Sequence, residues 1–116
     1  MFLELSHTKL DAFSVSKAFV MECYRQTKIF PSDEKFAMIS QIRRAALSVH
    51  LNIAEGCSRK SAAERKRFYE IARGSLIEAD AAMDIAVNPG YTSKERLEEV
   101  GKLIIRSFQL ISKLIS

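Results

Sequence analysis

Residues 61–90, SAAERKRFYEIARGSLIEADAAMDIAVNPG, predict one complete helix with a defined start and end. Ser61 and Glu64 match a capping box, in which each side chain accepts a hydrogen bond from a backbone N–H that the first helical turn leaves free. Small and apolar residues then recur at helical spacing, at Phe68, Ala72, Ser75, Ala79 and Ala82 or Met83. Asn88-Pro89-Gly90 has strong turn chemistry, so we expect the helix to end near Val87.

The segments at the two ends of the chain predict a further helix each. The first runs from about Leu10 to Thr27, and Pro31 closes the segment because it disfavours helical geometry at the preceding residue. Near the other end, Thr92 and Glu95 match a second capping box. We therefore expect the last helix to begin there and to extend to about Leu114.

Another helix is predicted between Ser32 and Gly56. Ser32 offers an N-cap hydroxyl, and Asp33 and Glu34 place negative charge in the first turn, where the helix dipole favours it. Apolar residues follow at helical spacing, at Phe36, Ile39, Ala46, Val49 and Ile53. Gly56 is the expected C-terminal stop of this helix.

Four helices and no alternating strand pattern predict an all-α protein. The 116 residues, 47% of them hydrophobic, are enough for one core but not for two, so residues 1–116 are expected to form a single domain. Similar helix lengths and short links favour an antiparallel up-and-down four-helix bundle. Within it, we expect Gly74, Ser75 and Ala79 to permit close contact between helices.

The first and last predicted helices carry more apolar surface than one stripe requires. In the first, Ala12, Phe19 and Cys23 lie on a different side from Phe13 and Val20. In the last, apolar residues cover an arc wider than the roughly 100° of an ordinary surface helix, at Leu97, Val100, Leu103, Ile104, Phe108, Leu110, Ile111, Leu114 and Ile115. Leftover apolar surface predicts a homo-oligomer. The alternative is a monomer with a few exposed apolar residues.

The residues that usually carry catalysis or bind metals are sparse. No stretch approaches the roughly 20 apolar residues of a membrane span, and the N-terminus lacks a signal-peptide pattern, so we expect a cytoplasmic protein without membrane contact. Cys23 and Cys57 lie far apart, and neither His7 nor His50 belongs to a metal-ligand or triad motif. We therefore expect no catalytic residues, no metal and no cofactor, and interpret His50 as structural.

Basic residues concentrate in the middle of the chain. The formal net charge is +4, but residues 41–75 alone contain eight basic and three acidic residues. The eight basic residues, which we interpret as candidate nucleic-acid-binding residues, are Arg43, Arg44, Arg59, Lys60, Arg65, Lys66, Arg67 and Arg73. Three of them crowd the start of the helix at Ser61, where positive charge opposes the dipole and a bound phosphate would offset that cost. The alternative is a solvated basic face.

The stretch from Phe30 to Ala86 resembles the family of 23S rRNA intervening-sequence proteins. The most specific matches are Arg43-Arg44-Ala45-Ala46, Asn52-Ile53-Ala54-Glu55-Gly56, Arg67-Phe68 and Ile71-Ala72-Arg73-Gly74-Ser75 followed by Glu78. Arg43, Arg44, Arg67 and Arg73 match arginines of the family pattern, whereas Arg59, Lys60, Arg65 and Lys66 match only its basic character. At His50-Leu51 the family commonly has proline and a small residue, so this helix is expected to be straighter here.

The resemblance implies an up-and-down bundle that assembles into a homopentamer. A relative of the family accompanies diversity-generating retroelements and is a basic pentamer that binds nucleic acid and a reverse transcriptase. We therefore expect a non-enzymatic oligomeric scaffold that binds nucleic acid or a nucleoprotein partner, such as a reverse transcriptase, with phosphate contacts from Arg59, Lys60, Arg65 and Lys66. The alternatives are a protein-binding adaptor or structural oligomer and, with least support, an unrecognised enzyme.

Overall fold

A computed structural model describes residues 1–116 and contains only helical secondary structure. The four α-helices are α1 (Asp11–Thr27), α2 (Met38–Cys57), α3 (Ala62–Val87) and α4 (Glu98–Ile115). Two short 3₁₀ turns, Ser6–Lys9 and Ser32–Glu34, precede α1 and α2. The all-α prediction is confirmed.

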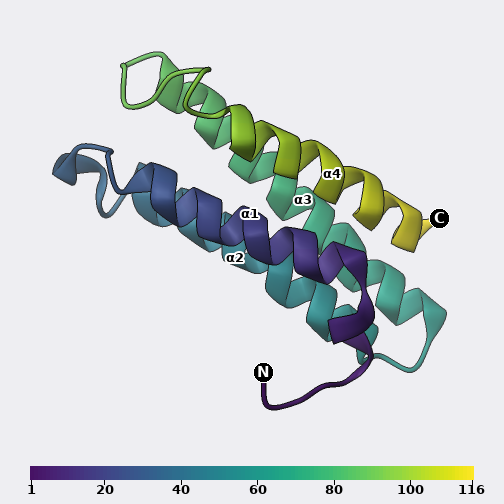
Figure 1. Ribbon diagram of the computed structural model, residues 1–116. Helices are drawn as coiled ribbons and strands as arrows, with labels where there is room; N and C mark the ends of the chain where they lie inside the picture. The colour runs from purple at the N-terminus through teal and green to yellow at the C-terminus, as the bar shows by residue number, and fades with distance from the viewer.

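The helices form a four-helix bundle in which neighbours in sequence run in opposite directions (Figure 1). α1 packs against α2 and α4, and α3 packs against the same two helices, while the backbones of the diagonal pairs lie further apart. Each link thus joins two helices that pack side by side and run antiparallel. None of the four α-helices combines the length and the hydrophobicity that a membrane span requires.

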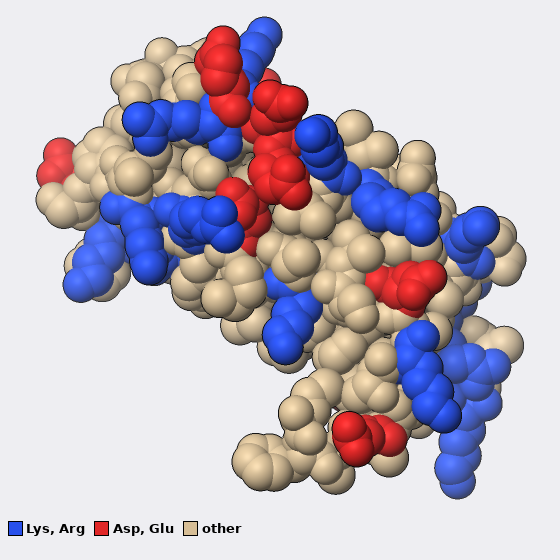
Figure 2. All heavy atoms as spheres, in the orientation of Figure 1, with Lys and Arg blue, Asp and Glu red and all other residues tan.

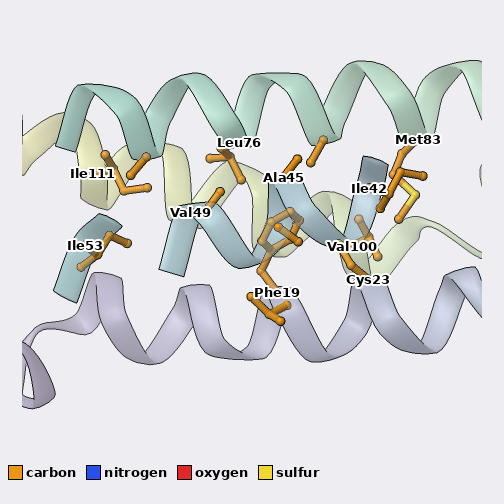
Figure 3. Close-up of a cluster of buried hydrophobic side chains, with 14 of the residues drawn as sticks. Phe19, Cys23, Ile42, Ala45, Val49, Ile53, Leu76, Met83, Val100 and Ile111 are labelled. Carbon is orange, nitrogen blue, oxygen red and sulfur yellow. The ribbon is translucent and has the colours of Figure 1, made fainter. Parts of the chain in front are cut away.

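All four helices contribute side chains to the core (Figure 3). Phe19 of α1, Ile53 of α2, Leu76 of α3 and Ile111 of α4 are fully buried. Each such side chain stabilises the fold by about 1.5–3 kcal/mol relative to leaving it in water. The core therefore spans the interior that the four helices share.

α1 buries more of its circumference than the sequence predicts. Ala12, Phe19 and Cys23 were expected on a different side from Phe13 and Val20, yet all five are buried. Because α1 lies in the angle between α2 and α4, one helix covers each of its two apolar sides. The two apolar sides that the sequence predicts for α1 are thus covered inside the bundle, and these residues give no support to an oligomer.

α2 begins later than the sequence predicts, and its start depends on a glutamate. After the 3₁₀ turn Ser32–Glu34, the backbone leaves helical geometry at Ala37, and α2 begins at Met38. The Oε2 atom of Glu34 accepts a hydrogen bond from the Met38 N–H at 3.1 Å, so it satisfies a free donor of the new first turn. The expected cap by Ser32 is wrong, and Phe36, expected in the core, is 89% exposed.

The two predicted capping boxes have different outcomes. The Ser61 Oγ accepts from the Glu64 N–H at 3.1 Å, which confirms the start of α3. The box at Thr92 does not form, because Thr92 is buried and its hydroxyl has no partner. The neighbouring Ser93 Oγ instead accepts from the Arg96 N–H at 3.2 Å, and a further turn precedes α4 at Glu98.

Two of the glycines, Gly56 and Gly74, have roles that differ from expectation, and a third, Gly90, has the expected role. Gly56 does not end α2, which continues to Cys57; a Cβ on it would lie 2.9 Å from both the Phe68 Cβ and the Tyr69 Cε1. It therefore permits α3 to approach α2 closely. Gly74 was expected to make such a contact, but nothing lies within 4 Å of its Cβ position. Gly90, with φ +83°, confirms the turn after α3.

Candidate nucleic-acid interface

Five of the eight candidate residues lie at the α2–α3 junction, which we define as residues 55–68. The junction comprises the end of α2, the link, and the first two turns of α3. Gly56 fixes its geometry because its missing side chain lets Phe68 and Tyr69 pack directly on α2. Figure 2 shows Lys and Arg side chains gathered at the end of the molecule where Figure 1 places this link.

Two of the five cations at the α2–α3 junction brace the link. The Arg65 Nη1 donates to the backbone oxygens of Arg59 and Lys60 at 3.0 and 2.8 Å. The Arg59 Nη2 pairs with the Glu55 Oε1 at 2.5 Å, and its guanidinium lies 4.8 Å from the centroid of the Phe68 ring. Both arginines therefore use part of their hydrogen-bonding capacity within the protein.

The other three cations, Lys60, Lys66 and Arg67, have no hydrogen bond or ion pair. All three are exposed, and the nearest interaction is that of the Arg67 guanidinium at 6.0 Å from the Phe68 ring centroid. The backbone amides of Ala62 and Ala63 are also without a hydrogen-bond partner. Free cations beside free helical amides form a surface on which an anion can be bound.

Arg43 and Arg73 lie outside the α2–α3 junction and connect helices. The Arg43 Nε donates to the Thr27 Oγ1 at 2.8 Å, and its guanidinium lies 4.7 Å from the Tyr24 ring centroid, which ties α2 to α1. The Arg73 Nη1 donates to the Ser112 Oγ at 3.1 Å, which ties α3 to α4. Two arginines that match the family pattern thus have structural contacts.

Arg44 is exposed, forms no hydrogen bond or ion pair, and lies near Lys35 and Phe36 around a hollow at the start of α2. The sequence does not predict Lys35 or Phe36 as site residues, because Phe36 fits the helical spacing of a core position. The adjacent pair of a cation and an aromatic, followed by Arg43-Arg44, is the pattern that could have indicated them. The eight candidates therefore occupy three places rather than one patch.

His50 has the environment of a structural histidine. Its Nδ1 lies 2.8 Å from the Ser16 Oγ, and its ring stacks on Phe13 with centroids 4.1 Å apart. Burial lowers the pKa of His50, and the charges of Lys17 and His7 lower it further. No group of three or more His, Cys, Asp or Glu side chains is placed to hold a metal ion.

The fold and the distribution of charged residues place this protein in the class of small four-helix bundles with a basic surface at one end. A family model described as 23S rRNA-intervening sequence protein matches residues 8–113, and the chain belongs to that family. A comparison with curated proteins finds no match.

The fold also occurs in a solved structure, that of a protein of unknown function from the S23 ribosomal protein family of Bacteroides thetaiotaomicron. The two chains are 20% identical, and the match covers 90% of this chain and 98% of that chain with a TM-score of 0.80. At this identity the likeness shows the shared fold alone.

Proposed function

We propose that this protein is a non-enzymatic, homo-oligomeric scaffold that binds nucleic acid through phosphate contacts at the α2–α3 junction. The observation that carries the proposal is the set of three unpartnered cations, Lys60, Lys66 and Arg67, around the free N-terminal amides of α3. Arg59 and Arg65 hold the link in place and add positive charge beneath them.

The electrostatics of the α2–α3 junction favour an anion. Positive side chains near a helix N-terminus repel the dipole, and each unfavourable placement costs about 0.3–1 kcal/mol. A phosphate accepts hydrogen bonds from the amides and neutralises the cations at the same time. Contacts of this kind position a nucleic acid without reading its sequence, so weak sequence preference is expected.

Apolar side chains on the outer face of α3 and α4 support the oligomer. Ile77 is 55% exposed and Ile105 is 61% exposed, and together with Phe108 they border a groove between the two helices. Exposed apolar groups that gather on one face mark a contact surface in soluble proteins. We propose that this α3–α4 face packs against other copies of the chain, with a pentamer as the favoured assembly.

A double variant tests the assembly. Changing Ile77 and Ile105 to glutamine should reduce the mass measured by light scattering from about five times the 13.1 kDa chain towards a single chain, with helix content unchanged. The matched control is Met21→Gln, because Met21 is an exposed apolar residue on α1. A parent protein that is monomeric at micromolar concentration would contradict the oligomeric part of the proposal.

A triple variant tests the phosphate contacts. Lys60→Gln, Lys66→Gln and Arg67→Gln together should weaken binding of both structured and single-stranded RNA at fixed ionic strength by a similar factor, because all three residues contact only the backbone. The control changes Lys94, Arg96 and Arg106, which are also exposed, to glutamine and removes the same charge elsewhere. An equal drop in affinity in both triple variants would show that net charge alone, and not the α2–α3 junction, controls binding.

A protein-binding adaptor is the second candidate, and the α3–α4 face favours it. The exposed apolar residues of this face, Ile77, Ile105 and Phe108, form a surface on which a partner protein can pack. Two results together would favour the adaptor function over the nucleic-acid-binding scaffold. The parent would bind no nucleic acid at low salt, and the double variant at Ile77 and Ile105 would no longer bind a defined protein partner that the parent binds.

A further inference from the structure

A hollow of about 330 Å³ lies at the start of α2, at the end of that helix opposite the α2–α3 junction. Its walls come from the end of α1, the segment before α2, and the first turns of α2. Apolar parts of Tyr24 and Leu47 line it together with Phe36, and its cations are Lys35, Arg43 and Arg44. No carboxylate lines it.

Phe36 is an exposed aromatic residue beside this hollow. It lies in the turn between the 3₁₀ turn Ser32–Glu34 and α2, and 89% of its surface is exposed. Leaving such a ring in water forgoes the roughly 1.5–3 kcal/mol that its burial would provide. The ring is therefore available to a ligand.

The cations around Phe36 differ in how they are held. The Lys35 Nζ lies 5.5 Å from the centroid of the Phe36 ring. Arg43 is fixed by its bond to Thr27 and by its position over Tyr24, so it forms a rigid positive wall. Arg44 is exposed and has no hydrogen-bond or ion-pair partner. An open aromatic ring with exposed cations beside it is the arrangement that binds an unpaired base and its phosphates.

We propose that this hollow binds one unpaired base of a single-stranded nucleic acid, with the base stacked on Phe36 and the flanking phosphates on Lys35 and Arg44. The proposal rests on the proposed function and deepens it, because it names single strands as the substrate class. α2 separates the hollow from the α2–α3 junction by about 30 Å, a distance that one strand can span. Duplexes keep their bases stacked inside and cannot use the hollow.

Two substitutions at Phe36 separate stacking from apolar contact. Phe36→Leu keeps an apolar side chain but removes the aromatic face, whereas Phe36→Trp keeps a face for stacking. The probes are a labelled oligothymidylate and an oligouridylate of about 15 nucleotides, with an abasic phosphodiester of equal length as the control. The Leu variant should bind both oligonucleotides about 5- to 150-fold more weakly and the abasic strand as the parent does.

Fluorescence gives a second, local readout. The chain contains no tryptophan, so the emission of the Phe36→Trp variant reports on this position alone. Oligothymidylate and oligouridylate should quench this emission, while the abasic strand and a blunt duplex should leave it unchanged. Quenching by only one of the two would assign the hollow to DNA or to RNA.

Three results would overturn the inference. The first is a parent that binds the abasic strand as tightly as the oligonucleotides, which would leave the phosphate contacts of the proposed function intact. The second is a Phe36→Leu variant whose oligomer mass falls, which would assign the exposed ring to an interface between copies. The third is a parent that binds no strand of any kind at low salt, in which case the proposed function fails as well.

Discussion

Replacing Gly56 by alanine should destabilise the bundle at the α2–α3 junction. The new Cβ would lie 2.9 Å from the Phe68 Cβ and 2.9 Å from the Tyr69 Cε1, closer than carbon atoms pack in proteins. The Phe68 Cβ is attached to the α3 backbone, and Tyr69 is only 5% exposed, so neither can rotate into open space. The first turns of α3 must therefore move away from α2.

The size of the effect follows from the kind of contact. Inserting one methyl group into a packed contact typically costs about 1–3 kcal/mol. For a chain of this length, unfolding entropy near the melting temperature is about 240 cal/mol/K, so each kcal/mol corresponds to about 4 °C. Gly56→Ala should accordingly lower Tm by about 4–12 °C.

Thermal unfolding followed by circular dichroism measures this directly, with Gly74→Ala as the matched control. Gly74 is exposed within α3 and has nothing within 4 Å of its Cβ position. There the same substitution should raise Tm by about 2–4 °C, because alanine is favoured over glycine in a helix by about 0.5–1 kcal/mol. If Gly56→Ala is as stable as the parent or more so, the close approach of α2 and α3 is not what requires glycine.

Three further outcomes are expected. Folding lowers the pKa of His50, so the unfolded chain takes up the proton at a higher pH than the folded chain. The free energy of unfolding should therefore fall as the pH drops through 6.5 towards the pKa of the folded state. In urea titrations, His50→Ala should weaken this pH dependence, while the variant should keep its assembly. Burial, and to a smaller extent the nearby charge of Glu22, raises the pKa of Cys23 to about 12. In the native protein, iodoacetamide should therefore label the partly exposed Cys57, and it should label Cys23 only after unfolding. Peptide mass spectrometry measures which cysteine is labelled. In chemical denaturation, Ser61→Ala should lose about 1 kcal/mol of stability, whereas Thr92→Val should be neutral or stabilising because its buried hydroxyl has no partner.

The sequence predicts a helix start correctly where the capping residue and its partner are neighbours in the chain. At Ser61 the capping residue is followed directly by the helix, and the bond from the Glu64 amide forms as expected. At Thr92 the same pattern is overridden by tertiary packing, since its side chain is buried. The start of α2 depends on Glu34, whose carboxylate bonds both Met38 and the Tyr91 hydroxyl across the bundle. A partner so distant in sequence is not visible in local spacing.

The same limit applies to the candidate site. Composition locates the basic segment, but only the fold separates cations that brace the protein from those that remain free. Arg65 bonds two carbonyls of the link and Arg73 reaches Ser112 on another helix, while Lys60 and Lys66 have no partner. Phe36 is a residue that the sequence places wrongly in the core. Its spacing fits a core position of α2, but the helix begins only after the break at Ala37, so Phe36 is exposed.

The salt dependence of RNA binding tests the central claim most directly. Affinity should be measured over a range of salt concentrations for the parent and for the variant with glutamine at Lys60, Lys66 and Arg67. The logarithm of the parent's affinity should fall linearly with the logarithm of salt concentration, and the variant's slope should be shallower by about 0.7–0.9 for each phosphate that it no longer neutralises. Parallel lines of equal affinity for the two proteins would contradict phosphate binding at the α2–α3 junction.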